Sequence, residues 1–236
     1  TYTSATQLLD KFKNKFDTEE RAQYMSDRYG FDPQYWKDKW KQETDKSLVR
    51  GNDIHGKKEA WLYEQKFDIH HGEALNVIVK GNYKENFPYN LLPDGIYPEL
   101  KLWRHDWQIA GRADKIILRS LEYTSKVVRS RIMDIEDYKT NKIIRTESFY
   151  DINELGIKEY RMMLGPLSHL MDCEFNHYAL QLSLYQYMGE YHGLLPGTRK
   201  IIHYQHEIEG LGTPDPKVIE LPYLRNEVIA MLTYKS

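Results

Sequence analysis

Residues 131–139 read Arg-Ile-Met-Asp-Ile-Glu-Asp-Tyr-Lys. The β-branched and aromatic residues of this stretch predict a strand over residues 127–138. Because side chains alternate across a strand, one face carries Met133, Ile135, Asp137 and Lys139. This face begins with two apolar side chains and ends with an acid and an amine. Asp134 and Glu136 point the other way. Asp137 and Lys139 should therefore be neighbours, roughly 6.6 Å apart along the strand.

A further acidic residue, Asp114, lies in the preceding predicted strand, residues 108–118. Alternation places Asp114 on one face with Arg112 and with the apolar residues Ala110 and Ile116. A carboxylate therefore interrupts a mostly apolar strand face.

Pairing of these two strands as a hairpin would bring Asp114 and Asp137 together at one end of the sheet, with Lys139 beside them. Carboxylates suit a hard cation such as Mg²⁺, which polarises a scissile phosphate and acidifies a bound water, while a lysine can orient that water. The pattern thus indicates metal-assisted phosphodiester hydrolysis. A purely structural interpretation competes with it: Asp137 and Lys139 form an ion pair worth under about 1 kcal/mol, and Asp114 pairs with Arg112 or Lys115.

A candidate nitrogen ligand, His55, lies upstream. Residues 51–67 read as the opening of a helix, in which His55 and Glu59 are four residues apart and share one face. A neutral imidazole is a good transition-metal ligand and would shift the site toward Mn²⁺. Alternatively, His55 is a helix N-terminal histidine that hydrogen-bonds to its own helix.

A predicted helix over residues 178–191 carries a polar stripe beside its apolar one, and this stripe begins just before the helix: His177, Gln181 and Tyr185. Gln181 and Tyr185 could hydrogen-bond a phosphate or lie near a base. A pair at the edge of the core explains the same pattern equally well.

Hydrophobic periodicity predicts the order of elements along the chain. Helices are expected over residues 1–66, with a break at Asp32-Pro33, then over residues 153–192 and 223–234. Strands are expected over residues 75–79, 99–103, 108–118, 127–138 and 199–209, with a loop over residues 83–98. We therefore expect one α/β domain over residues 1–236, with a helical N-terminal extension (1–46), a core (47–209) and a C-terminal segment (210–236).

Composition excludes several protein classes. The 236 residues include one cysteine, Cys173, which rules out an internal disulfide framework and a cysteine-ligated iron–sulfur cluster and favours an intracellular protein. No apolar run approaches the ~20 residues of a membrane span, so we expect no membrane association. The net charge is −2, from 33 Lys and Arg against 35 Asp and Glu, so that any polyanion must be held by a local basic surface.

Four motifs follow one another along the chain: Gly51 to His55 with Glu59, Gly111-Arg112-Ala113-Asp114, Asp137-Tyr138-Lys139-Thr140, and Gln181 with Tyr185. In type and order they resemble the PD-(D/E)XK nuclease superfamily, in particular the branch with the RecB and AddB nuclease domains and related phage and mitochondrial exonucleases. The resemblance covers roughly residues 47–190. It implies a restriction-endonuclease-like core, in which a central mixed β-sheet is flanked by helices.

The resemblance also implies roles for individual residues. Asp114 and Asp137 would ligate a catalytic Mg²⁺ or Mn²⁺, helped by His55 and by the main-chain carbonyl of Tyr138. Lys139 would position or activate the nucleophilic water.

Other residues match supporting positions of the family: Glu59, Glu99, Arg112, Gln181 and Tyr185. Gln181 and Tyr185 would help to hold the active-site helix and the DNA backbone, and Arg112 would brace the site. Several family members carry four cysteines for an iron–sulfur cluster; this chain has only Cys173, so no cluster is expected.

The leading hypothesis is a metal-dependent DNA nuclease, specifically an exonuclease, of DNA repair, recombination or phage DNA metabolism. Its partners would be single-stranded DNA or duplex ends, together with replication or recombination proteins. Two alternatives remain open: a catalytically silent nucleic-acid-binding subunit with the same fold, and a nuclease that cleaves RNA.

Overall fold

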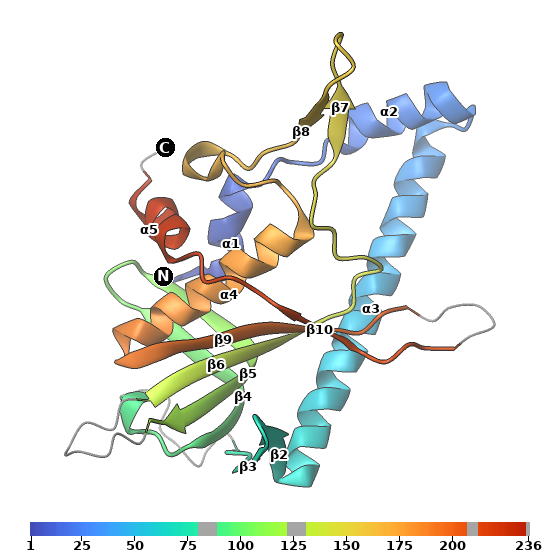
Figure 1. Cartoon of the computed structure of the whole chain (residues 1–236). Coiled ribbons are helices and arrows are strands. Elements are labelled where there is room, and N and C mark those ends of the chain that lie inside the picture. The colour runs from blue at the N-terminus through green and yellow to red at the C-terminus, as the bar shows by residue number, and fades with distance from the viewer. Residues whose placement is uncertain (80–88, 122–130, 207–211, 235–236) are drawn as a thin grey trace.

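Figure 1 shows the computed structural model, which describes residues 1–79, 89–121, 131–206 and 212–234. The central sheet has six strands: β1 (Thr3–Ser4), β4 (Gly95–Arg104), β5 (Ile109–Ser120), β6 (Arg131–Lys139), β9 (Leu194–His203) and β10 (Lys217–Glu220). Two small hairpins lie apart from it: β2 (Phe67–His70) with β3 (Glu73–Asn76), and β7 (Tyr150–Ile152) with β8 (Lys158–Tyr160). The helices are α1 (Ala5–Leu9), α2 (Thr18–Tyr29), α3 (Pro33–Gln65), α4 (Glu174–Tyr191) and α5 (Arg225–Thr233), with short 3₁₀ turns at Asp10–Phe12, Tyr89–Leu91 and Gly165–Leu167.

The sheet is mixed. β5 is antiparallel to β4 and to β6, whereas β6 and β9 are parallel. β6 occupies one edge of β5 from Lys115 onward, and β1 pairs with Ile109 and Ala110 along that same edge. Among the described residues, positions 111–114 of β5 therefore have no strand partner on this edge. This gap contains the Gly-Arg-Ala-Asp motif.

The main core lies between the sheet and α4, which crosses one face of it (Figure 1). Ile116 and Leu118 of β5 and Met133 and Ile135 of β6 point into this core. A smaller cluster on the opposite face joins the C-terminal part of α3 to the sheet: Leu62, Val77, Ile96 and Ile117. The sheet is thus flanked by helices, as the sequence predicts.

α3 is a single helix of 33 residues. Asp32 caps it by accepting a hydrogen bond from the Gln34 N–H (2.7 Å), and Pro33 occupies the first turn, where a missing N–H costs nothing. The predicted break at Asp32-Pro33 is therefore the start of this helix. α3 runs uninterrupted past residue 46 and past Gly51, so the expected helix opening at Gly51 is wrong and the motif lies in the helix interior.

The segment over residues 153–192 differs most from its prediction. It begins in the β7–β8 hairpin, where Gly156 has a φ of +75° and Asn153 accepts hydrogen bonds from the N–H groups of Leu155 and Ile157. Helix starts only at Glu174. Both hairpin strands are largely exposed, so their sequence carries no burial pattern to distinguish them.

Other boundaries also shift. β4 begins at Gly95, inside the expected loop over residues 83–98, and β10 was not predicted. The predicted strands at β3, β5, β6 and β9 and the C-terminal helix are confirmed in type. Parts of three predicted segments, residues 83–88, 127–130 and 207–209, lie outside the described residues. No helix in the described ranges combines the length and apolar character needed to cross a bilayer.

Two glycines offer a matched test of this packing. A Cβ on Gly197 would lie 2.6 Å from the Met133 carbonyl oxygen, at the irregularity in β6–β9 pairing, so Gly197→Ala should destabilise the fold by about 1–3 kcal/mol. A Cβ on Gly56, within α3, would meet nothing within 4 Å, so Gly56→Ala should stabilise it by roughly 0.5–1 kcal/mol. Urea unfolding of both variants measures the difference; equal midpoints would contradict it.

Candidate active site

β5 and β6 separate at the two predicted aspartates. Their last paired residues are Lys115 and Glu136, so continuation of the register would place Asp114 opposite Asp137. Instead, the Asp114 carboxylate accepts a hydrogen bond from the Tyr138 N–H (2.7 Å, Oδ2). A hydrogen bond to a side chain thus replaces the next backbone hydrogen bond between the two strands. Asp114 and Asp137 both lie where β5 and β6 separate, a place called the fork below.

The regular alternation of side chains in β4 and β5 is also interrupted beside Asp114. Ala113 and Ile116, three residues apart, both contribute to the main core, although strict alternation would put them on opposite faces. The predicted sharing of one face by Arg112, Asp114 and Ile116 is therefore wrong. In β4, the residue facing Asp114 in the register is Glu99, whose φ of +55° breaks the regular strand.

His55 reaches this fork from the middle of α3. Its Nδ1 lies 3.1 Å from Oδ1 of Asp114, and this contact raises the pKa of His55. His55, Glu99 and Asp114 each offer a ligand atom, and these atoms lie within 4.8 Å of one another. Two carboxylates and an imidazole form a donor set that suits Mg²⁺ or Mn²⁺. The alternative that His55 bonds to its own helix is wrong.

Buried Asp137 and partly buried Lys139 form an ion pair, as the structural interpretation of this motif predicts. Burial raises the pKa of Asp137 to about 6, Lys139 opposes this, and the charge of Asp114 adds to it. Burial also acts to lower the pKa of Lys139, but the neighbouring Asp137 and Asp114 charges hold it above its usual value. The Lys139 ammonium lies 4.8 Å from the centre of the Tyr178 ring, which forms one wall of its site.

The structural alternative for Asp114 is also wrong. Arg112 pairs with Glu99 (3.3 Å), and Lys115 points to the other face, where it pairs with Asp68 (2.7 Å) and Glu136 (2.9 Å). Neither cation neutralises Asp114. Burial raises the pKa of Glu99, and the charge of Asp114 adds to that shift.

Gln181 and Tyr185 line the α4 side of β5. The Gln181 side-chain amide donates to the Tyr185 hydroxyl (3.0 Å), and burial raises the pKa of Tyr185 to about 12. A Cβ on Gly111 would collide with the Tyr185 ring, so this glycine lets α4 approach the strand. Glu59 is half-buried and affects the cluster only through its charge on Glu99.

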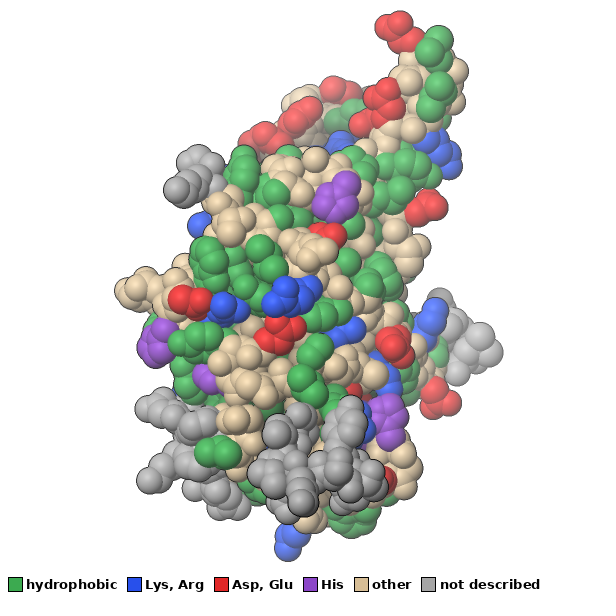
Figure 2. Space-filling view, turned by 60° about the vertical axis from the view of Figure 1, so that its left-hand side comes forward, with side chains coloured by type: hydrophobic (Ala, Val, Ile, Leu, Met, Phe, Trp, Pro, Cys, Tyr) green, Lys and Arg blue, Asp and Glu red, His purple; other side chains and the backbone are tan. Residues whose placement is uncertain are grey.

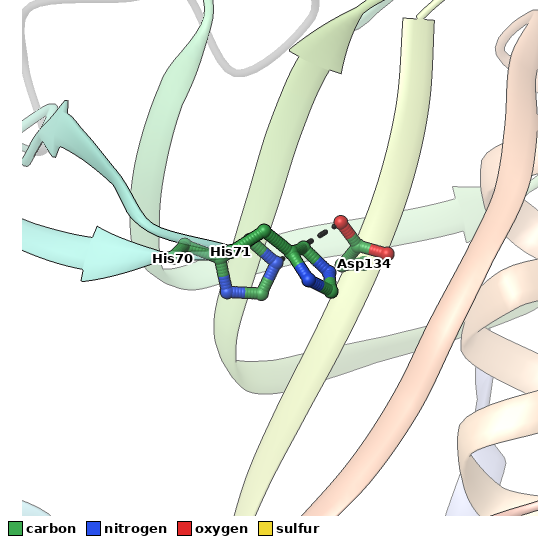
Figure 3. Close-up of side chains that lie close together, drawn as sticks. All are labelled: His70, His71 and Asp134. Atoms are coloured by element: carbon green, nitrogen blue, oxygen red, sulfur yellow. Dashed lines mark hydrogen bonds and ion pairs between the residues drawn. The ribbon is translucent and has the colours of Figure 1, made fainter.

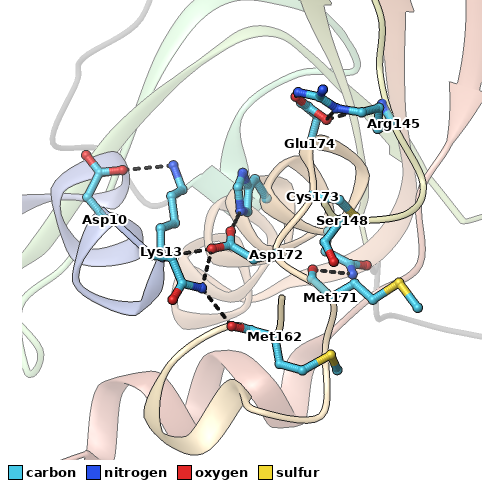
Figure 4. Close-up of polar contacts among 12 residues, drawn as sticks. Asp10, Lys13, Arg145, Ser148, Met162, Met171, Asp172, Cys173 and Glu174 are labelled. Carbon is cyan, nitrogen blue, oxygen red and sulfur yellow. Dashed lines mark hydrogen bonds and ion pairs between the residues drawn. The ribbon is translucent and has the colours of Figure 1, made fainter. Parts of the chain in front are cut away.

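His177, from the same predicted stripe, does not join the site. It pairs with Asp172, whose carboxylate also accepts hydrogen bonds from the backbone and side chain of Asn14 (both 2.7 Å). Figure 4 shows these contacts around the start of α4, with the Arg145–Glu174 ion pair beside them. This polar cluster fixes the N-terminal segment and the start of α4.

A groove of about 590 Å³ opens beside His55, between α3 and the chain that follows β6. Small polar residues line much of it, among them Ser47, Asn52, Thr140 and Asn141, and Lys142 and Glu43 contribute one charge of each sign. Sequence analysis missed the groove, although Thr140 belongs to the Asp-Tyr-Lys-Thr motif. Of the candidate site residues, His55 lines the groove.

No protein-family model, curated protein sequence or solved structure matches this chain. Any functional assignment therefore depends on the residues at the fork and their geometry.

The Asp137–Lys139 pair can be tested by a double-mutant cycle. Lys139→Met leaves Asp137 buried without its cation and should destabilise the fold by about 3–5 kcal/mol. Asp137→Asn combined with Lys139→Met removes both charges and should recover most of that loss. Denaturant unfolding of the two single variants and the double variant measures the coupling; strictly additive effects would contradict it.

Proposed function

We propose that this chain is a divalent-metal-dependent nuclease that hydrolyses phosphodiester bonds in DNA, with a PD-(D/E)XK-type, restriction-endonuclease-like core. The observation that carries the proposal is the buried Asp137–Lys139 pair at a strand fork, with Asp114, His55 and Glu99 around it. Carboxylates that can hold a divalent ion, with an amine beside them that can orient a water, suit metal-assisted hydrolysis.

His55, Asp114 and Asp137 would hold Mg²⁺ or Mn²⁺ with the main-chain carbonyl of Tyr138, and Glu99 is positioned to join them. The donor set fits such an ion because the local acids outnumber their cations: among the residues that the structure describes, Arg112 pairs with Glu99 alone and Lys139 with Asp137 alone. When bound, the metal supplies a Lewis acid that polarises the phosphate and lowers the pKa of a coordinated water.

The chain's own residues would arrange the reactants. Lys139, held between Asp137 and the Tyr178 ring, would orient the attacking water through its ammonium N–H groups. Asp114 is fixed by the Tyr138 N–H and His55, so its carboxylate needs little reorganisation. Gln181 and Tyr185 would hold α4 against the fork.

The groove beside His55 supports a polynucleotide substrate. Its small polar side chains and Lys142 suit the sugar-phosphate backbone rather than a base-specific contact. On the face drawn in Figure 2, acidic side chains gather over the upper end, where α2 and the β7–β8 hairpin lie, and basic and acidic side chains are interspersed across the middle. We propose single-stranded DNA or duplex ends as substrates, exonucleolytic cleavage, and an intracellular role in repair, recombination or phage DNA metabolism beside replication or recombination proteins.

Cleavage of end-labelled oligonucleotides with Mg²⁺ or Mn²⁺ tests the proposal directly. Lys139→Met should lower the cleavage rate about 10²–10⁴-fold, because the water loses its orienting group, and Asp137→Asn should lower it at least as much. Arg131→Met is the matched control: Arg131 is a buried cation paired with Asp94 at the other end of β6, and its loss should leave cleavage intact.

Thermal unfolding of each variant separates loss of chemistry from loss of fold. Matched single-stranded DNA, duplex DNA and RNA should be compared in parallel. If folded Lys139→Met cleaved at the rate of the parent protein, the proposal would be overturned. It would also be overturned if the parent protein cleaved none of these substrates.

The nitrogen ligand gives a further prediction. His55→Asn replaces imidazole by an oxygen donor, so activity with Mn²⁺ should fall about tenfold more than activity with Mg²⁺. Asp53→Asn is the control, since Asp53 lies on the same helix but pairs with the exposed Lys57 (2.7 Å). An unchanged Mn²⁺ to Mg²⁺ activity ratio in His55→Asn would remove His55 from the ligand set.

A further inference from the structure

A second group of metal-ligand residues lies on the other face of β6. Figure 3 shows His70 and His71 at the turn of the β2–β3 hairpin, beside Asp134. Their candidate ligand atoms lie within 4.8 Å of one another. Asp134 points away from the face that carries Asp137 and Lys139, so this group is separate from the candidate active site.

The hairpin turn holds both imidazoles in place. His71 has a φ of +49° and Gly72 a φ of +81°, and a non-glycine residue in the left-handed region carries a conformational cost. This turn places the two imidazole rings 4.4 Å apart, centre to centre. His70 is buried and His71 is exposed, so one side of the group is open to solvent.

His70 and Asp134 face each other as two ligands of one ion would. Nε2 of His70 lies 3.1 Å from Oδ2 of Asp134. Neighbouring ligands of a tetrahedral zinc ion, at about 2.0–2.1 Å from the metal, are separated by a similar distance.

The surrounding contacts match those that orient metal ligands. On its other side, Nδ1 of His70 lies 3.5 Å from Glu136, which in turn pairs with Lys115. A carboxylate behind a histidine is the usual arrangement at zinc sites. Oδ1 of Asp134 is held by the N–H (2.6 Å) and hydroxyl (2.9 Å) of Thr198, which leaves Oδ2 toward His70 and Arg119 (2.7 Å).

A metal-free explanation accounts for part of this geometry. A doubly protonated His70 would donate to both Asp134 and Glu136, and Arg119 and Lys115 would complete the network. It gives no role to His71, which makes no hydrogen bond or ion pair within the described part of the chain. Positive φ at both His71 and Gly72 is what a tight two-residue hairpin turn requires, and a shared ligand would in addition give the second imidazole a function.

We propose that His70, His71 and Asp134 form a second metal site, for a first-row transition dication, with Zn²⁺ as the ion that best fits two imidazoles, one carboxylate and an open position. The ion would join the β2–β3 hairpin, which follows directly on α3, to β6 in the central sheet. It would thereby fix the C-terminal end of the helix that carries His55.

Calorimetric titration of untagged protein with Zn²⁺ tests this site. The titration uses the His55→Ala/Asp137→Asn background, which removes donors at the fork, so the result does not depend on the proposed nuclease function. Adding His71→Ala should weaken Zn²⁺ binding at least about 100-fold and abolish the rise in melting temperature that Zn²⁺ produces. His169→Ala removes a different exposed histidine, one that pairs with Glu227 (3.3 Å), and should change neither.

His71 is exposed, so its removal should leave the fold intact, and circular dichroism of the metal-free variants confirms this. Unchanged Zn²⁺ affinity in His71→Ala would overturn the proposal and favour the doubly protonated His70. Absence of Zn²⁺ binding in the background protein would overturn it as well. Loss of nuclease activity in other experiments would have no bearing on either result.

Discussion

The hydrogen bond from the Tyr138 N–H to the Asp114 carboxylate is the interaction on which the site depends. Two antiparallel strands in register would otherwise continue to pair past Lys115 and Glu136. Because the carboxylate satisfies the free N–H, β6 can leave β5 without an unpaired buried donor. The separation leaves Asp114 and Asp137 at the point where the strands part, and α3 brings His55 to Asp114.

The acidic residues on the two faces of β6 lie in different charge environments. Asp134 is fully buried, yet His70, Arg119 and Thr198 compensate its charge, and its pKa lies well below the usual range. On the opposite face, Asp137 has its pKa raised, with Lys139 as its partner and Asp114 as a repelling neighbour. Like charge concentrated at Asp137 and Asp114 destabilises the fold, and a bound cation would relieve that repulsion. This contrast is the physical basis of the proposed function.

α3 connects the candidate active site with the hairpin that carries the proposed Zn²⁺ ligands. It is mostly exposed, with Trp36 and Leu62 as its buried residues, so few apolar contacts fix its position. One anchor is the Leu62 cluster near its C-terminal end, and the β2–β3 hairpin with His70 and His71 follows directly. His55 lies two helical turns before Leu62, so the position of its imidazole depends on this anchor. The proposed Zn²⁺ would therefore act on the geometry of the fork from the other face of the sheet.

The sequence by itself determined the mixed α/β class, the strand β6 and the placement of Asp137 and Lys139 on one face, because alternation in a strand is local geometry. It also singled out His55, Asp114, Gln181 and Tyr185. Only the tertiary structure decided that β5 changes faces at Asp114, that His55 lies within a 33-residue helix, and that Glu99 joins the cluster while His177 does not. These depend on strand register, on a residue with positive φ and on contacts between distant segments, none of which leaves a periodic pattern in the chain.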